Sequence, residues 1–218
     1  KESNSLYFVQ QERMNKIQHI FLILYLILLP SYVIRSQNTK ILDLKTCADE
    51  PTKIPLTLNT NEFTICLRFS LTYLTPTYVL WSENLTSIHL SNFESKIGFV
   101  SVHSQSQIFM YPNEILPEQW VHLCYTYKQK YISIVLNGQL LHDDIFIDTE
   151  PENVLENTDL YLGHSNEIPY QSFNGYISDL NIWTDAKNVK EMKYFTSDCK
   201  AIPNPDLIDW NVWSSRSK

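Results

Sequence analysis

The chain has 218 residues, of which 44% are apolar and 13% aromatic, which is enough for a packed core and excludes an intrinsically disordered protein. Its formal net charge is −7. A surface of this charge repels nucleic acids and acidic membranes, so we expect no nucleic-acid partner.

The first 36 residues have the features of a leader followed by a secretory signal peptide. Met14 is a plausible start, and the 13 residues before it match no motif. Ten unbroken apolar residues, Ile20 to Leu29, form the hydrophobic region, and Ser36 supplies the small residue before the cleaved bond. We therefore expect cleavage near Ser36, a secreted protein, and a single domain over residues 37–218.

The alternative is a membrane anchor formed by uncleaved residues 17–34. A spanning helix needs about 20 consecutive apolar residues, and this stretch is shorter and is followed by Arg35. After cleavage no stable membrane insertion is expected. The mature chain then carries 13 Lys and Arg against 22 Asp and Glu, a net charge of −9.

Short apolar or alternating runs bounded by turn residues recur along the mature chain and indicate an all-β fold of two packed sheets. In chain order these predicted strands are Phe63–Ser70, Tyr78–Trp81, Ile97–Val102, Gln107–Tyr111, Trp120–Tyr127, Tyr131–Leu136, Gln139–His142, Leu160–Gly163 and Tyr176–Trp183. Asn137-Gly138 predicts a two-residue hairpin turn, because that turn needs positive φ at both positions.

One short helix is expected near the C-terminus. Asn188 can cap it, Glu191 stands three residues later, and Val189, Met192 and Phe195 form an apolar stripe. This helix would cover one side of the sandwich.

Four cysteines, Cys47, Cys66, Cys124 and Cys199, follow the signal segment, and an even number in a secreted chain indicates two disulfides. Three pairings are possible in principle. Cys66 and Cys124 are each out of phase with the apolar residues of their predicted strands, so their sulfurs meet across one face if those strands are neighbours. Cys47 and Cys199 would then join the two ends of the domain.

Several segments, in this order, resemble the pentraxin domain, a laminin G-like and concanavalin-like jelly-roll sandwich. The resemblance covers about residues 40–213 and implies the Cys66–Cys124 bridge as well as the sandwich fold. The segments that carry it are Phe63-Thr64-Ile65-Cys66-Leu67-Arg68-Phe69, Trp120-Val121-His122-Leu123-Cys124, Leu136-Asn137-Gly138, Leu162-Gly163, Phe173-Asn174-Gly175-Tyr176-Ile177-Ser178-Asp179-Leu180-Asn181-Ile182-Trp183 and Leu207-Ile208-Asp209-Trp210.

Pentraxins typically bind phosphorylated head groups or sugars through two calcium ions, which need six to eight oxygen ligands. The family's Asp-Asn pair is missing from Ser70 to Trp81, a stretch with no acid and no amide. After Leu162-Gly163 only Asn166, Glu167 and Gln171 offer suitable oxygens. We therefore expect a degenerate calcium site that binds weakly or not at all, and no other cofactor.

No catalytic motif stands out, and the sequence predicts a protein that is not an enzyme. His142-Asp143-Asp144 is interpreted as a polar strand edge, and Glu62, Glu83, Glu94 and Glu114 as solvated acids. Asn84 starts the sequence's N-glycosylation sequon. Six tyrosines are candidates for sugar stacking or partner contact, about half of which we expect in the core: Tyr73, Tyr78, Tyr111, Tyr125, Tyr127 and Tyr131.

The sequence thus predicts a secreted pentraxin-like recognition module for a carbohydrate, a lipid head group or a protein partner, without the full calcium site. One alternative is a calcium-dependent lectin that uses Asn166, Glu167 and Gln171. Another is a sandwich glycosidase, which would need a pair of carboxylates in a cleft. Pentraxins commonly form rings, so an oligomer is possible.

Overall fold

The computed structural model describes residues 41–44, 52–59, 61–82, 86–92, 97–102, 105–110, 115–147, 155–164, 173–197, 205–210 and 212. All of them belong to the unit Thr39–Lys218. The proposed leader and signal segment therefore lies outside the described residues. Among the helices that the structure describes, none combines the length and the apolar character that crossing a membrane requires.

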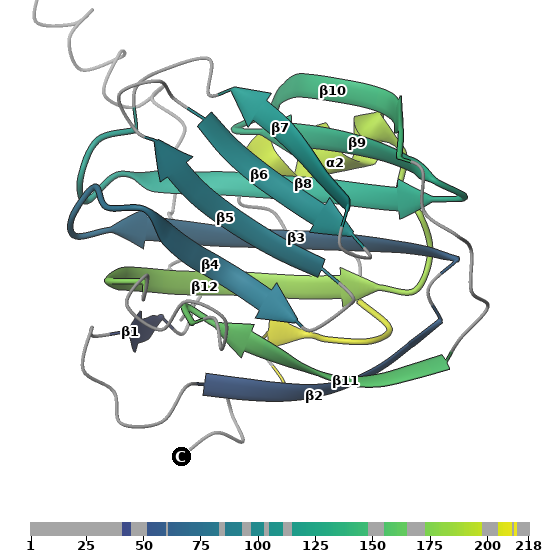
Figure 1. Cartoon of the computed structure of the whole chain (residues 1–218), viewed down its shortest axis with the longest axis horizontal. Coiled ribbons are helices and arrows are strands. Elements are labelled where there is room, and N and C mark those ends of the chain that lie inside the picture. Colours follow the sequence, from purple (N-terminus) through teal and green to yellow (C-terminus); the bar gives the residue numbers. More distant parts are fainter. Residues whose placement is uncertain are drawn as a thin grey trace, which may run out of the picture. The chain divides into compact units, whose positions relative to one another are not determined.

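The described strands form two antiparallel six-stranded sheets (Figure 1). Sheet 1 has the order β1 (Leu42–Leu44), β12 (Gly175–Trp183), β3 (Glu62–Leu71), β8 (Trp120–Lys128), β9 (Tyr131–Leu136) and β10 (Gln139–Phe146). Sheet 2 has the order β2 (Thr52–Asn59), β11 (Leu155–Leu162), β4 (Thr77–Ser82), β5 (Thr86–Asn92), β6 (Ile97–Val102) and β7 (Gln105–Met110). The helix α2 spans Val189–Ser197. The predicted all-β sandwich with one short helix is confirmed.

Three strands escaped prediction from the sequence, namely β1, β2 and β5. β1 has only three residues, too few for a pattern. β2 alternates correctly, with Ile54 and Leu56 buried, but Pro55 lies at its centre and argues against a strand. β2 is an edge strand, which is where a sheet tolerates proline.

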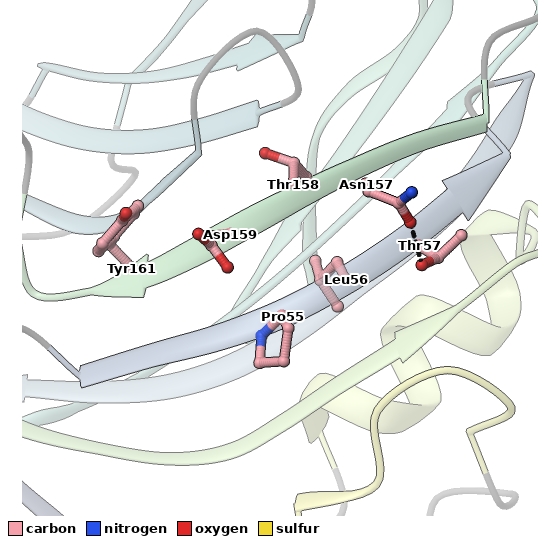
Figure 2. Close-up of a pocket in the computed structure, with 7 residues that line it drawn as sticks. All are labelled: Pro55, Leu56, Thr57, Asn157, Thr158, Asp159 and Tyr161. Atoms are coloured by element: carbon pink, nitrogen blue, oxygen red, sulfur yellow. Dashed lines mark hydrogen bonds between the residues drawn. The ribbon is translucent and has the colours of Figure 1, made fainter.

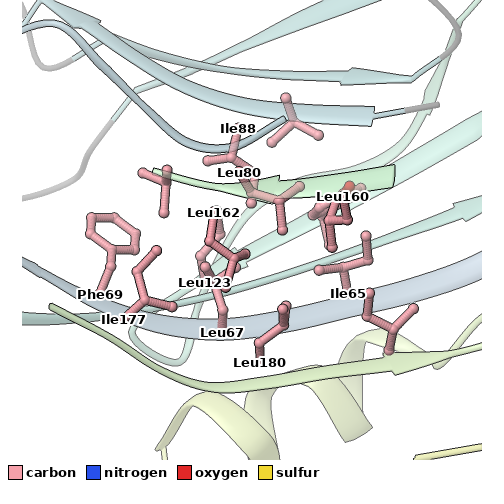
Figure 3. Packing of buried hydrophobic residues seen from close by; sticks show 14 of the residues in the cluster. Ile65, Leu67, Phe69, Leu80, Ile88, Leu123, Leu160, Leu162, Ile177 and Leu180 are labelled. Carbon is pink, nitrogen blue, oxygen red and sulfur yellow. The ribbon is translucent and has the colours of Figure 1, made fainter. Parts of the chain in front are cut away.

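The core lies between the two sheets and follows the predicted alternation of β3. Ile65, Leu67 and Phe69 point from sheet 1 toward Leu80 and Leu160 of sheet 2 (Figure 3). One polar link crosses this apolar layer, because the Tyr125 hydroxyl of β8 forms a hydrogen bond with the Thr86 hydroxyl of β5. Burial raises the pKa of Tyr125, so its hydroxyl stays protonated.

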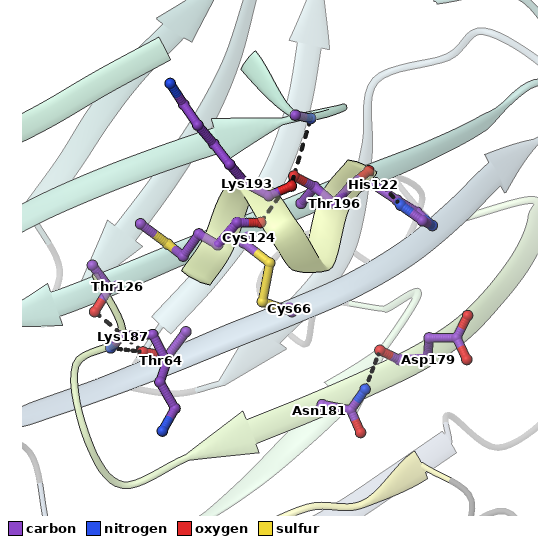
Figure 4. Close-up of a disulfide and its surroundings, with 12 residues drawn as sticks. Thr64, Cys66, His122, Cys124, Thr126, Asp179, Asn181, Lys187, Lys193 and Thr196 are labelled. Carbon is purple, nitrogen blue, oxygen red and sulfur yellow. Dashed lines mark hydrogen bonds between the residues drawn. A yellow bond between two sulfur atoms is a disulfide. The ribbon is translucent and has the colours of Figure 1, made fainter. Parts of the chain in front are cut away.

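The outer face of sheet 1 carries the disulfide. Cys66 of β3 lies directly opposite Cys124 of β8, and the two sulfurs are bonded, as strand phase predicted. The helix α2 lies over the bridge (Figure 4). Its predicted apolar stripe, Val189, Met192 and Phe195, packs with the two cysteines in one cluster. The Phe195 ring also stacks on Trp183 of β12, with ring centroids 5.4 Å apart. Cys47 and Cys199 lie outside the described residues, and their pairing stays a prediction.

The two ends of α2 are fixed by polar groups. At the N-terminus, the Asn188 side chain accepts a hydrogen bond from the Glu191 backbone N–H at 3.0 Å, and the Glu191 carboxylate accepts one from the Asn188 N–H at 2.9 Å. This is the predicted capping box. In the last turn, the Thr196 hydroxyl accepts a hydrogen bond from the Gly138 N–H at 3.0 Å. The helix is therefore tied to the β9–β10 turn.

That turn and the strand after it agree with the sequence prediction. Asn137 and Gly138 have φ of 47° and 78°, both positive as the two-residue hairpin requires. The strand β10 is an edge of sheet 1, so His142-Asp143-Asp144 does lie on a polar edge. The pairing of β10 with β9 shifts register twice around His142, and the Ser133 hydroxyl of β9 donates a hydrogen bond to Asp143 at 2.9 Å.

We expect the variant Cys66→Ala/Cys124→Ala to lose about 4 kcal/mol of unfolding free energy, because the bridge closes a loop with a sequence separation of 58. Urea unfolding of the oxidised wild type and the variant measures the difference. Wild type treated with a reductant that opens the bridge is the control and should approach the variant. A loss below about 1 kcal/mol would show that the bridge adds little to stability.

Candidate functional site

A pocket of about 410 Å³ opens on the outer face of sheet 1, beside the disulfide. We call it the Arg68 pocket. Its lining comes from β3, β8, β12, the β9–β10 turn and the residue before β1, and consists of Ile41, Arg68, Trp120, His122, Asn137, Ser178 and Asp179. It combines apolar groups with convergent polar ones, which is the usual composition of a ligand site.

Strand register brings the polar residues together. Arg68 is directly opposite His122 on one side and Ser178 on the other. Arg68 follows Cys66 by two residues and His122 precedes Cys124 by two, so all four side chains lie on the same face. The pocket is therefore the polar continuation of the face that carries the disulfide.

A β-bulge places Asp179 in the pocket. The pairing of β12 with β3 shifts between Ser178 and Asn181, and Asp179 has a φ of 51°. Left-handed backbone at a residue other than glycine is uncommon and concentrates at functional sites. The buried Asn181 side chain holds this conformation by donating a hydrogen bond to the Asp179 carbonyl at 3.0 Å (Figure 4).

Asp179 and Arg68 form an ion pair, with 3.2 Å between Nε and Oδ2. The two side chains are only 17% and 21% exposed. Burial raises the pKa of Asp179, whereas the Arg68 charge and the Ser178 hydroxyl lower it. The ion pair uses the Nε of Arg68. The two terminal nitrogens of the guanidinium lie further along the side chain and carry additional N–H donors.

His122 is held by three hydrogen bonds. Its backbone N–H donates to the Asn137 side chain and its carbonyl accepts from the Asn137 N–H, both at 2.8 Å. Its Nδ1 lies 2.9 Å from the carbonyl oxygen of Thr196 in α2. A carbonyl cannot donate, so Nδ1 carries the proton and Nε2 is left as an acceptor.

The charge state of His122 follows from its surroundings. Burial and the Arg68 charge lower its pKa to about 4, although the hydrogen bond to Thr196 acts to raise it. The ring is therefore neutral at pH 7, and with Arg68 and Asp179 opposed, the formal charges of the pocket lining cancel. Trp120 stands at the rim with 39% of its surface exposed.

A second hollow of about 450 Å³ lies along β2 and β11, in sheet 2 (Figure 2). Its polar groups are largely paired with one another. Thr57 donates a hydrogen bond to Asn157 at 2.6 Å, and Lys53 lies 2.6 Å from Asp159. These pairs stabilise the contact between the strands, and no bulge redirects a side chain here. We therefore take the Arg68 pocket as the candidate site.

None of the residues predicted for calcium binding or glycosylation is among the described residues that line this pocket. Asn84 and the candidate calcium ligands Asn166, Glu167 and Gln171 are outside the described residues, so the structure places none of them. Within the described part of the chain, no three His, Cys, Asp or Glu side chains gather as a metal site would require. The expectation of weak or absent calcium binding stays a prediction.

The six candidate tyrosines separate by burial. Tyr125 and Tyr127 belong to the core, while Tyr73 and Tyr131 are exposed. Tyr78 is half-buried with its ring 4.4 Å from that of His89, and Tyr111 lies outside the described residues. The aromatic residue at the pocket is Trp120, which was predicted as the start of a strand and not as a binding residue.

One signal in the sequence could have revealed the bulge. The apolar residues of β12 that face the core between the sheets are Ile177, Leu180 and Ile182, so one interval is three residues where a regular strand has two. The extra residue is Asp179. No comparable signal marks His122 or Asn137, since their proximity depends on the pairing of β8 with β9 and on the turn that follows.

The family described as the Concanavalin A-like lectin/glucanases superfamily matches residues 48–193. The fold is similar to that of a native heptameric SAP-like pentraxin from Limulus polyphemus, with a TM-score of 0.63, 18% identity, and 78% of this chain and 87% of that chain covered. The pentraxin resemblance is thus confirmed at the level of the fold. No curated protein matches the sequence.

Two toxin binding domains share the fold at lower coverage. The binding domain of Paraclostridial Mosquitocidal Protein 1 has a TM-score of 0.54 and 14% identity, with 73% of this chain and 45% of that chain covered. The binding domain of botulinum neurotoxin serotype D/C has a TM-score of 0.52 and 18% identity, with 69% and 41% covered. This chain thus spans less than half of either toxin domain.

The lowered pKa of His122 predicts a pH-dependent stability. The neutral His122 ring contributes at most about 3 kcal/mol to the free energy of unfolding. This contribution is fully present above pH 6.5 and is lost as the pH falls toward about 4. The pKa of Asp179 is raised, so its protonation favours the folded state as the pH falls, opposite to the effect of His122. We expect His122→Asn, which keeps a donor for Thr196 but cannot titrate, to lose less stability than wild type between pH 7 and pH 4.5.

Urea unfolding at the two pH values gives this difference. His142→Gln, which removes a histidine from the edge strand β10, is the matched control and should behave as wild type. Equal pH slopes for wild type and His122→Asn would refute the assignment.

Proposed function

The chain belongs to the Concanavalin A-like lectin/glucanases superfamily, and we propose that it is a secreted recognition module that binds a carbohydrate in the Arg68 pocket without calcium. The observation that carries this proposal is the bulge at Asp179. It sets a carboxylate beside a guanidinium, a neutral imidazole and an exposed indole on one face of the sandwich. Fold similarity alone would not choose a ligand.

The polar groups of the pocket suit the hydroxyls of a sugar. Asp179 and the Nε2 of His122 accept hydrogen bonds, whereas Arg68 donates them. A sugar hydroxyl both donates and accepts, so it can join groups of either kind. The exposed Trp120 ring offers an apolar surface on which a sugar ring can stack. The two binding modes together give orientation as well as affinity.

The other ligand classes fit this lining less well. The phosphate of a lipid head group would approach the Asp179 carboxylate at close range, and the chain as a whole is negative. A glycosidase needs two carboxylates flanking the bond, whereas the Arg68 pocket and the β2–β11 hollow each have one among their described lining residues, Asp179 and Asp159. A protein partner would require a broader surface than a pocket of this size.

The compartment is proposed on two observations. The buried Cys66–Cys124 bridge is typical of oxidising environments. The signal-like segment at residues 1–36 would direct the chain there. We extend the proposal to N-glycosylation at Asn84, which lies between β4 and β5 in the sequence. A ring-shaped or other oligomer is compatible with it and is not needed for the pocket.

We expect Asp179→Asn to reduce carbohydrate affinity about 10- to 100-fold, since it removes charge-assisted hydrogen bonds while keeping the shape. Asparagine also tolerates the positive φ at this position. Calorimetry with glucose, galactose, mannose and their neutral disaccharides, in the presence of a chelator, measures the effect. Asp159→Asn is the matched control, because it makes the same change in the β2–β11 hollow. If Asp159→Asn weakens binding and Asp179→Asn does not, the site has been misplaced.

Calcium separates this proposal from its nearest rival, a calcium-dependent lectin that uses Asn166, Glu167 and Gln171. We expect millimolar calcium to leave both Tm and sugar affinity unchanged, because a single carboxylate in that loop cannot match the charge of two ions. Differential scanning calorimetry with calcium and with chelator provides the test. A saturable rise in Tm, removed by Glu167→Gln, would establish the rival mechanism instead.

A further inference from the structure

The outer face of sheet 1 continues beyond the Arg68 pocket into a row of three residues in register. Ser70 of β3 is opposite Tyr176 of β12 on one side and Trp120 of β8 on the other. The two aromatic residues have nearly equal exposure, 38% for Tyr176 and 39% for Trp120. Two strand spacings separate their backbones, about 10 Å. The Ser70 side chain between them is small, so it projects less far from the sheet than the two aromatic rings.

Backbone packing fixes Tyr176 in this row. Gly175 precedes it with a φ of 157°, and a Cβ at that position would lie 2.0 Å from the Ser70 carbonyl oxygen. Only glycine allows β12 to approach β3 so closely at this point. The Thr72 N–H also donates to the Asn174 carbonyl at 2.9 Å, which fixes the start of β12. The Tyr176 ring therefore projects from a rigid part of the sheet.

The row runs along the edge of the pocket. Trp120 belongs to both, since it lines the Arg68 pocket and ends the row. Ser178 and Arg68 occupy the next positions on β12 and β3 on the same face, two residues from Tyr176 and Ser70. An extended ligand can thus enter the pocket at one end and contact Tyr176 at the other without crossing to another face.

Charge restricts the class of that ligand. In the described residues the pocket carries two formal charges, which oppose each other in the Arg68–Asp179 pair, and Asp43 of β1, directly opposite Tyr176, adds a carboxylate beside the row. An anionic sugar would have to compete with the Asp179 carboxylate for the guanidinium. A neutral sugar instead uses both partners, by accepting from Arg68 and donating to Asp179.

From these observations we infer that the ligand is a neutral oligosaccharide of at least two rings, with one ring in the Arg68 pocket against Trp120 and the next in a second subsite on Tyr176. This inference rests on the proposed carbohydrate-binding function. It adds a residue outside the pocket, a minimum ligand length and the absence of ligand charge.

The test compares sugars of different length on matched variants. The probes are glucose with maltose, galactose with lactose, and mannose with mannobiose, and glucuronic acid and a heparin disaccharide represent acidic sugars. We expect Tyr176→Ala to weaken binding of the disaccharides about three- to tenfold and to leave the monosaccharides unchanged. Trp120→Ala should weaken both, and Tyr176→Phe should behave as wild type.

Tyr131→Ala is the matched control, because Tyr131 is 45% exposed in the same sheet and pairs with Lys128, at the opposite end of β8 from Trp120. Thermal melts verify that each variant is folded. If Tyr176→Ala leaves the disaccharide affinity unchanged, the second subsite is overturned. If the acidic sugars bind more tightly than the neutral ones, the neutral ligand is overturned. In either case carbohydrate binding itself stands. If the folded wild type binds none of these sugars, the proposed function and this inference are both overturned.

Discussion

The pairing of β3 with β8 is the constraint on which the rest of the structure depends. These strands lie at the centre of sheet 1, and nine consecutive residue pairs join them without a shift. The Cys66–Cys124 bond fixes that register covalently. A slip by one residue would turn the inward apolar residues outward and at the same time separate Arg68 from His122. Core and pocket are thus determined by a single alignment.

The helix α2 carries this constraint to the rim of the pocket. Its apolar residues rest on the disulfide, and its last turn receives hydrogen bonds from His122 and Gly138. The imidazole is therefore oriented by a helix that is itself positioned by the bridge. Packing interactions on one part of the face thus set the hydrogen-bonding geometry on the adjacent part.

Local patterns predicted those features that depend on few residues. The alternation of Phe63, Ile65, Leu67 and Phe69 gave the buried face of β3 and, from it, the disulfide face. The Asn188 to Glu191 capping box and the Asn137-Gly138 turn are complete within four residues, so they too were predicted correctly.

The remaining features depend on contacts between distant residues. β2 was missed because Pro55 is acceptable only at a sheet edge, and edge position is a property of the whole sheet. Asp179 and His122 are 57 positions apart in the sequence and meet only through β3. The pentraxin resemblance points instead to Asn166, Glu167 and Gln171, which are outside the described residues.

The edge strand β10 has a consequence for the behaviour of this protein at high concentration. An open strand edge is a template on which another chain can add itself, and uncontrolled addition leads to aggregation. Here two register shifts interrupt the regular ladder of β10, and Asp143 and Asp144 are exposed charged residues at that edge, two features that disfavour the addition of another strand. Pairing between two copies of the protein along this edge is therefore disfavoured even when the protein is concentrated, whereas Trp120 and Tyr176 lie on strands in the interior of the same sheet.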